Sequence, residues 1–393
     1  MQRSAGIYIH IPFCERKCTY CNFNTTDFFK DLAHRYIEAV AGEIGFWGQS
    51  LLQASPDRIQ VDTIYFGGGT PSIVEAEQLA SLVVSCREAF ELATDAEITI
   101  EVNPATLSSQ KVDCWLSAGI NRVSVGVQSF IDEELVALSR THTSDDARRT
   151  IDLLRKAGFQ NISLDLIAGL PGQDLAAWQF NMREALAIGP EHLSLYMLDL
   201  KEGTQLYAQL KRGKRPYPDD DLGAEMYRMI SDATQGAGYE HYEISNFALL
   251  GGRDATEGIS PFRSKHNSKY WTGAAYYGMG CGAHSYDGIA RWVNVLKTEA
   301  YIDRIATQGN AISERSELSE EDRAAEALFM GLRLSEGIDL TAFRSEYGVD
   351  VIERYGGELP RLADAGLIAI DGSRLALTAA GRLLSNEVFV SFV

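Results

Sequence analysis

The sequence predicts an α/β protein whose core is a partial (β/α)6 TIM-like barrel or an open α/β sheet. Its 393 residues allow one large barrel-type domain and a smaller one. Six apolar strand-like runs occur in the first 240 residues, at 6–12, 62–69, 97–104, 122–129, 162–172 and 192–200. Segments with helical periodicity separate them, at 75–92, 108–118, 145–157 and 175–188. Such alternation is typical of a parallel sheet covered by helices, and six units fall short of the eight of a closed barrel.

Two changes of pattern divide the rest of the chain. Residues 248–265 are glycine-rich and aperiodic, and the cluster HNSKYW follows them. We therefore assign 1–240 to the barrel core and 241–312 to a region that closes it. Residues 313–393 predict a small winged-helix-like α+β module, with a helix at 320–334 and two short strands around a turn. This module has few basic residues, which favours a docking or lid role over DNA binding.

The composition excludes several classes of function. The chain carries 36 Lys and Arg against 54 Asp and Glu, a formal net charge of −18, so no nucleic-acid partner is expected. The N-terminal MQRSAGIYIHIP reaches a strand at once, without the pattern of a signal peptide. No apolar run approaches the roughly 20 residues that span a bilayer, so we expect no transmembrane segment and leave peripheral membrane contact open. These features predict a cytoplasmic protein in a reducing compartment.

Three cysteines form a C-x3-C-x2-C array after the first strand: Cys14, Cys18 and Cys21. Three thiolates at this spacing hold three irons of a [4Fe–4S] cluster and leave the fourth iron without a protein ligand. An α-amino acid chelates such an open iron through its amine and carboxylate. A closed zinc site needs a fourth ligand at a suitable spacing, and no second cysteine pair follows. A zinc knuckle and three unrelated core thiols are the alternatives.

Other informative residues lie at the carboxyl ends of the predicted strands, where parallel α/β proteins gather their chemistry. The second strand ends in Gly67-Gly68-Gly69-Thr70-Pro71, which lets a ligand approach the backbone closely. Glu101, Gln128 and Asp165 lie on the next strands and suit ribose hydroxyls and ammonium donors. Each feature alone is more often turn geometry or a helix cap. The combination on one rim predicts a cofactor site.

The motifs occur in a specific order: YIHIPFCxxxCxYC, FGGGTPS, ExNP, GVQSF, DLIxGLPGQ and YEISNFA. In this order they resemble, over nearly the whole chain, the radical S-adenosylmethionine (SAM) superfamily. Within it the chain is similar to the family of oxygen-independent coproporphyrinogen III oxidases and HemW-type haem chaperones. The resemblance implies that Cys14, Cys18 and Cys21 bind the cluster, and that its one-electron reduction cleaves SAM to methionine and a 5′-deoxyadenosyl radical. It implies that SAM is bound by Tyr8, Gly68, Gly69, Thr70, Glu101, Gln128, Arg140 and Asp165.

Two further features bear on the branch of the family. The oxidases carry a fourth cysteine two positions after the third, where this chain has Phe23. The chaperone branch carries H-N-x-x-Y-W, found here from His266 to Trp271. The resemblance implies that His266 binds haem, since imidazole is a good haem-iron ligand. The alternative is a core histidine among packed aromatics. His284 and Cys281 are backup iron ligands, and the stretch 251–262 is an apparent insertion before the motif.

We therefore expect a haem chaperone that delivers haem to an acceptor haemoprotein and needs an electron donor for its cluster. The main alternative is an oxygen-independent coproporphyrinogen III oxidase, which Phe23 puts in doubt. A radical SAM enzyme acting on RNA is the third candidate, and the acidic composition argues against it.

Overall fold

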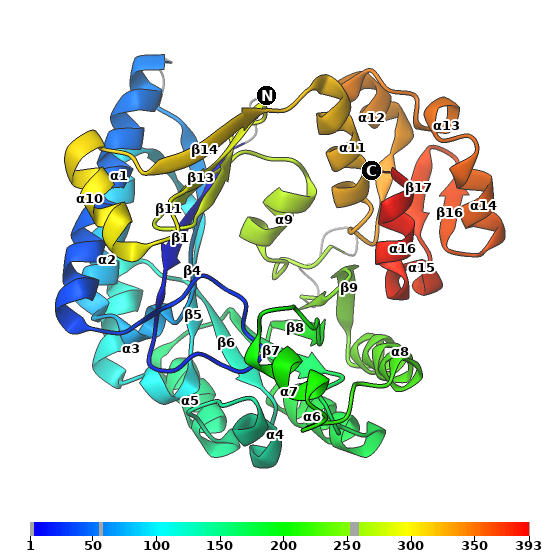
Figure 1. Ribbon diagram of the computed structural model, residues 1–393, viewed down its shortest axis with the longest axis horizontal. Coiled ribbons are helices and arrows are strands. Elements are labelled where there is room, and N and C mark those ends of the chain that lie inside the picture. Colours follow the sequence, from blue (N-terminus) through cyan, green and yellow to red (C-terminus); the bar gives the residue numbers. More distant parts are fainter. Residues whose placement is uncertain (1–3, 55–57, 252–258, 393) are drawn as a thin grey trace.

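The computed structural model describes residues 4–54, 58–251 and 259–392. A single twelve-stranded sheet curves around the middle of the molecule (Figure 1). From one edge to the other its strands are β14 (Ile312–Glu317), β13 (Ala290–Asn294), β12 (His284–Tyr286), β11 (Tyr276–Met279), β1 (Ala5–Ile11), β4 (Gln60–Gly68), β5 (Glu91–Val102), β6 (Arg122–Gln128), β7 (Ile162–Ala168), β8 (His192–Met197), β10 (Asn246–Leu249) and β9 (Tyr239–Glu243).

The centre of this sheet confirms the predicted fold class. The six predicted strands are β1, β4, β5, β6, β7 and β8, and each pairs in parallel with the next in that order. Strand β11 extends the parallel part beside β1. Antiparallel strands β12–β14 continue one edge, and β10 and β9 continue the other. Because β14 and β9 do not pair with each other in the described chain, the barrel stays open.

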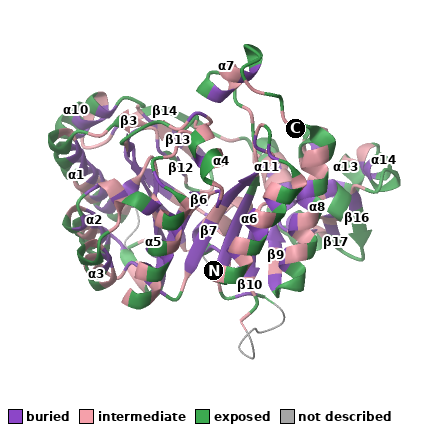
Figure 2. Ribbon diagram, turned by 90° about the horizontal axis from the view of Figure 1, so that it is seen from below, coloured by how far each residue is buried: buried purple, intermediate pink, exposed green. Residues whose placement is uncertain are grey.

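Helices cover the outer face of the sheet. In order they are α1 (Lys30–Ala54), α2 (Ala76–Ala89), α3 (Ser109–Ala118), α5 (Ser144–Ala157), α6 (Leu175–Ile188), α8 (Asp220–Gly236) and α10 (Thr298–Gln308). The strands are buried, and the helices turn exposed residues outward (Figure 2). The predicted helices at 75–92, 108–118, 145–157 and 175–188 are present as α2, α3, α5 and α6. Helix α1, twenty-five residues long, was missed.

Successive side chains along a strand point alternately into two different environments. On β6, Val123, Val125 and Val127 are fully buried in the apolar core between sheet and helices. Arg122 and Ser124 alternate with these valines and border a cavity on the other face. The interior of the curved sheet is therefore polar, unlike the packed apolar interior of a closed barrel.

A second unit follows the sheet and has a core of its own. It comprises α11 (Glu320–Gly331), β15 (Ile338–Asp339), α12 (Leu340–Tyr347), α13 (Val351–Arg354), α14 (Glu358–Asp364), β16 (Ile368–Asp371), β17 (Arg374–Leu377), α15 (Ala379–Leu383), α16 (Ser385–Phe389) and a 3-10 turn (Val390–Phe392). Its three strands form the sheet β15-β17-β16, as in a winged helix. The predicted boundaries at 240 and 312 remain predictions; the large sheet itself runs through both and ends at Glu317.

Short elements complete the described chain. They are β2 (Phe13–Cys14), β3 (Thr26–Asp27), α4 (Asp132–Ala137), α7 (Gln205–Lys211), α9 (Lys265–Trp271) and the 3-10 turns Pro71–Ile73 and Pro104–Thr106. Helix α9 lies between the curved sheet and the second unit (Figure 1), where the Arg333 guanidinium stacks 4.3 Å from the Trp271 ring.

The predicted insertion at 251–262 falls partly outside the described residues, at 252–258. Within the described ranges, every helix is too short or too polar to cross a bilayer.

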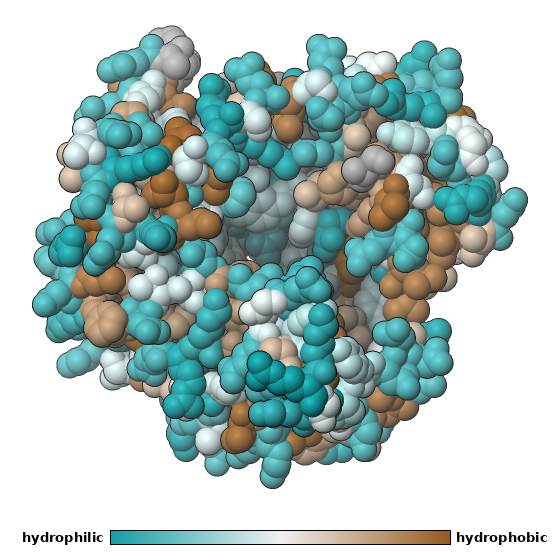
Figure 3. Space-filling model, in the orientation of Figure 1, coloured by the Kyte–Doolittle hydropathy of each residue, from teal (hydrophilic) through white to brown (hydrophobic). Residues whose placement is uncertain are grey.

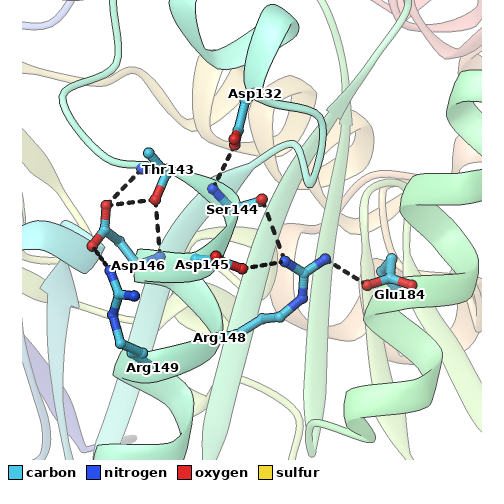
Figure 4. Close-up of polar contacts among 8 residues, drawn as sticks. All are labelled: Asp132, Thr143, Ser144, Asp145, Asp146, Arg148, Arg149 and Glu184. Carbon is cyan, nitrogen blue, oxygen red and sulfur yellow. Dashed lines mark hydrogen bonds and ion pairs between the residues drawn. The ribbon is translucent and has the colours of Figure 1, made fainter.

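The start of α5 is held by a capping box (Figure 4). The Thr143 hydroxyl accepts from the Asp146 backbone N–H at 3.2 Å, and the Asp146 carboxylate accepts from the Thr143 N–H at 2.8 Å. These bonds satisfy N–H groups that the first turn leaves unpaired. Arg148 then joins α5 to α6 through an ion pair with Glu184 at 2.7 Å. This start matters because the segment directly before it carries Arg140.

We predict that Thr143→Ala lowers the free energy of unfolding by about 1 kcal/mol, since the cap loses its side-chain acceptor. Urea denaturation of the full chain measures the change. The matched control is Ser144→Ala, because the Ser144 hydroxyl accepts only a 3.3 Å bond from Arg148 and contributes little. Equal losses in both variants would contradict the assigned cap.

Candidate functional site

A cavity of about 370 Å³ opens at the carboxyl ends of the parallel strands. The face of the molecule drawn in Figure 3 is hollowed near its centre, inside the arc of strands seen in Figure 1. All the predicted site residues except Tyr8 and His266 border this cavity: Cys14, Cys18, Cys21, Gly68, Gly69, Thr70, Glu101, Gln128, Arg140 and Asp165. Strand ends that are far apart in the sequence therefore meet at one place, as the parallel topology requires.

The cysteine loop forms one wall of the cavity. Cys14 ends β2, and Cys18 and Cys21 follow before β3; all three thiols are free and half-buried. The Thr70 hydroxyl lies 3.5 Å from Cys14 Sγ, and the Arg140 guanidinium donates to Cys18 Sγ at 3.6 Å. Burial raises the pKa of the Cys14 and Cys21 thiols, so metal binding has to displace their protons.

These thiols fit a cluster better than a single metal ion. Within the described ranges, no three His, Cys, Asp or Glu side chains converge on a point that one ion would occupy. A [4Fe–4S] cluster does not need such convergence, because each cysteine binds a different iron. Three separate thiols around one cavity therefore suit a cluster that each of them would bind through a different iron.

The glycine turn after β4 supports this wall. A Cβ on Gly69 would lie 2.7 Å from the Phe13 carbonyl oxygen, so only glycine allows this approach. The Gly69 N–H donates to Ile11 O and the Thr70 N–H to Phe13 O, both at 2.8 Å. The Gly68 N–H donates to Glu101 at 3.2 Å. Since these N–H groups are used inside the protein, they are not available to bind an anion, and Glu101 beside the turn can accept from a ligand's amine.

Two carboxyl groups line the cavity with different partners. Burial raises the pKa of Glu101 to about 7, although it accepts from the Tyr65 hydroxyl at 2.9 Å. Burial also raises the pKa of Asp165, whose oxygens accept from the Ser124 hydroxyl at 3.0 Å. Both groups lose hydration that a cationic or hydroxyl-bearing ligand would replace.

The backbone is strained at Gln128, the last residue of β6, and at Ser139, the residue before Arg140. Gln128 and Ser139 have φ values of 67° and 59°, and both border the cavity. Left-handed backbone costs a non-glycine residue roughly 1–3 kcal/mol, so the surrounding structure must hold it in place. Arg140 follows Ser139 and donates to the Gly126 carbonyl at 2.7 Å, which aims its other nitrogen at Cys18.

His266 lies behind the cavity wall and not in it. Its ring is 1% exposed and stacks on Tyr65 at a centroid distance of 5.1 Å. Nδ1 lies 2.9 Å from the Thr63 hydroxyl, and Nε2 lies 3.0 Å from the Tyr270 hydroxyl. Burial lowers its pKa to about 3, so the ring stays neutral. Both ring nitrogens are thus bonded inside the protein, and ligation of haem iron by His266 stays a prediction.

Three other residues singled out from the sequence also lie away from the cavity wall. Tyr8 packs between His10 and Tyr65, with its hydroxyl 3.1 Å from His10 Nδ1. Cys281 is fully buried, and His284 is exposed on β12. Neither backup ligand borders the cavity, whereas Phe23 does and is 61% exposed.

The structure adds cavity residues that the motif search missed, among them Arg122, Ser124, Tyr196 and Asn267. Arg122 and Ser124 precede Gln128 at steps of two along β6, so alternation alone placed them on its face. Asn267 directly follows His266 in the motif. The motif therefore carries an amide that could have been considered as a site residue beside the imidazole.

Comparison with known proteins agrees with this architecture. Residues 8–182 match the Radical SAM superfamily, and residues 318–384 match the HemN C-terminal domain. The chain is 37% identical to the heme chaperone HemW of Bacillus subtilis (strain 168), over 98% of each sequence. It is 34% identical to the heme chaperone HemW of Lactococcus lactis subsp. lactis (strain IL1403), over 100% of this chain and 98% of the relative.

A mitochondrial relative and a solved structure extend the comparison. The chain is 32% identical to Radical S-adenosyl methionine domain-containing protein 1 of Bos taurus, over 99% of this chain and 87% of that protein. The structure of the radical SAM enzyme coproporphyrinogen III oxidase (HemN) from Escherichia coli superposes with a TM-score of 0.84 at 24% identity, covering 100% of this chain and 90% of that one. At that identity the likeness establishes the fold alone. The similarity to the HemW proteins, above 30% over nearly the full length, establishes more: this chain belongs to the radical SAM superfamily and, within it, to the HemW family.

Proposed function

We propose that the protein is a haem chaperone that binds haem and passes it to an acceptor haemoprotein. The observation that carries this proposal is the similarity, over 98% of each sequence, to a protein named heme chaperone HemW. Phe23 at the position of the oxidases' fourth cysteine supports the same conclusion. The acceptor is a protein of unknown identity, and an electron donor supplies the cluster. We place the protein in the cytoplasm, where its six free cysteines stay reduced.

In this proposal the cavity holds the cofactors of the superfamily. Cys14, Cys18 and Cys21 would hold a [4Fe–4S] cluster, and the glycine turn and Glu101 would hold the amine of SAM. Such a cluster, once reduced, cleaves SAM to methionine and a 5′-deoxyadenosyl radical. Gln128, Arg140 and Asp165 orient SAM, and Tyr8 supports the wall through Tyr65. The protein's own part is to position these groups and exclude water.

Haem is held in this proposal without His266 as its iron ligand. Because that imidazole has a partner on each nitrogen, iron ligation would cost a buried hydrogen bond and require α9 to move. Covalent attachment through C-x-x-C-H is absent from the sequence. Haem would be held by packing and by polar contacts of its propionates.

The second candidate is oxygen-independent coproporphyrinogen III oxidation, because the whole chain superposes on that enzyme's fold. One experiment separates the two functions. We expect anaerobically reconstituted protein to bind haemin in a saturable titration and to transfer it to an apo-haemoprotein. We expect no product when the same preparation receives coproporphyrinogen III, SAM and reductant. Product formation without haem transfer would replace the chaperone with the oxidase.

We predict that SAM affinity depends on the protonation of Glu101. A hydrogen bond donated by the iron-bound amine of SAM would favour the ionised form of this carboxyl, so binding expels a proton below the pKa of about 7. Affinity should therefore rise roughly fivefold or more between about pH 6 and about pH 7.5. Equilibrium dialysis of the reconstituted protein measures it. Glu101→Gln should bind more weakly and with a flat profile; an unchanged slope in that variant would rule out Glu101 as the titrating group.

We predict that His266→Phe keeps haem affinity within about twofold and lowers the free energy of unfolding by about 1–3 kcal/mol, because two buried hydroxyls lose a partner. A haemin titration and a urea melt of the same preparation test both parts. If the folded variant loses haem binding, or if the haem absorption bands shift, His266 is an iron ligand after all.

A further inference from the structure

Arg122 at the floor of the cavity is a buried charge whose Nε lacks a hydrogen-bond partner. Its side chain is 1% exposed, and it borders the cavity from the first position of β6. Among the described residues, no buried acceptor meets this Nε. Leaving such a donor unpaired is expensive, so native proteins rarely do it without a ligand or a functional reason.

Two carboxyl groups that feel the Arg122 charge, Glu101 and Asp165, accept hydrogen bonds from other donors. Glu101 accepts from Tyr65 and Gly68, and Asp165 accepts from Ser124. Burial raises the pKa of both groups, and the Arg122 charge only partly offsets this. Arg122 therefore acts on both groups through its charge.

Asn267 reaches the same cavity from helix α9. It borders the cavity together with Arg122 and Ser194, and its backbone N–H donates to the Ser264 hydroxyl. The ring nitrogens of its neighbour His266 are both bonded inside the protein. Within the motif, the asparagine is thus the residue that borders the cavity.

We propose that Arg122 and Asn267 form a carboxylate-binding subsite at the floor of the cavity. A guanidinium donates two parallel N–H groups to a carboxylate, and the Asn267 amide adds a further donor. A single arginine flanked by Glu101 and Asp165 suits a monoanion and disfavours a doubly charged phosphate. The subsite lies deep in the cavity, because Arg122 begins β6 whereas Gln128 ends it at the rim.

Two ligands bring such a carboxylate: a propionate arm of haem, and the amino-acid part of SAM. The depth favours the propionate, because the glycine turn and Glu101, which suit the SAM amine, lie nearer the cysteine loop. The assignment to haem rests on the proposed function. The carboxylate subsite itself does not, because SAM tests it separately.

The test compares ligands with and without the carboxylate on the reconstituted full-length protein. We expect Arg122→Gln to weaken haemin binding about tenfold or more, since a charge-assisted bond is lost. Haemin dimethyl ester, whose propionates are masked, should bind the variant and the wild type equally. SAM and decarboxylated SAM should bind the variant as they bind the wild type. Ser268→Ala on the same helix is the control, because its hydroxyl donates to the Ser264 carbonyl.

A second variant keeps the test decisive if Arg122→Gln does not fold. Asn267→Asp adds a negative charge to the cavity that Arg122 borders, so it should weaken the binding of haemin more than the binding of its ester. Equal losses for haemin and its ester, or no loss in either variant, would overturn the subsite and leave the proposed function standing. If the wild type binds neither porphyrin, the proposed function fails. The subsite then stands only if these variants weaken SAM binding and spare decarboxylated SAM.

Discussion

The close contact between the glycine turn and the cysteine loop is the constraint on which the site depends. Gly69 lies against the backbone of Pro12 and Phe13, at a distance that no side chain would allow. Two backbone hydrogen bonds of 2.8 Å then join the end of β4 to the loop that carries Cys14. Strand β4 in turn lies between β1 and β5 in the rigid parallel sheet. The thiols are thereby held at the mouth of the cavity, although they lie on a loop.

The chemistry of the cavity depends on charged side chains that are buried inside the curved sheet without a full set of hydrogen-bond partners. Burial raises the pKa of Glu101 and of Asp165 at the cavity wall, and the charge of Arg122 partly offsets this rise. Apolar valines occupy the alternate positions of β6, so the sheet is anchored to its helices whatever the cavity contains. The side chains on one face of each strand thus stabilise the fold, and those on the other face can bind a ligand. This division allows a polar interior in an open sheet without loss of the apolar core.

The motif from His266 to Trp271 takes part in two different contacts. Its histidine joins the aromatic stack with Tyr65 behind the cavity wall, and Trp271 stacks under Arg333 of the second unit. Only Asn267 faces the cavity. The short helix α9 is therefore mainly a connection between the sheet, the floor of the cavity and the C-terminal unit. A ligand that contacts Asn267 would therefore contact the same helix whose Trp271 packs against Arg333 of the second unit.

Much of the fold was predictable because its signals are local. Apolar runs and helical periodicity located the six parallel strands and the helices between them, and the order of motifs identified the superfamily. Helix α1 was missed because it lies between the cysteine loop and β4, outside the repeats that the strand pattern defined. The antiparallel edge strands were missed because short strands of three to six residues carry little periodic signal.

The sequence by itself determined which residues carry the chemistry of the rim, since cysteine spacing and glycine turns depend on neighbours in the chain. The tertiary structure decided which of the remaining polar residues face the cavity. Whether a histidine offers a free nitrogen depends on hydroxyls from Thr63 and Tyr270, which lie on different elements. Whether Arg122 is paired depends on where Glu101 and Asp165 direct their oxygens. Both are properties of packing between distant segments, and no local pattern encodes them.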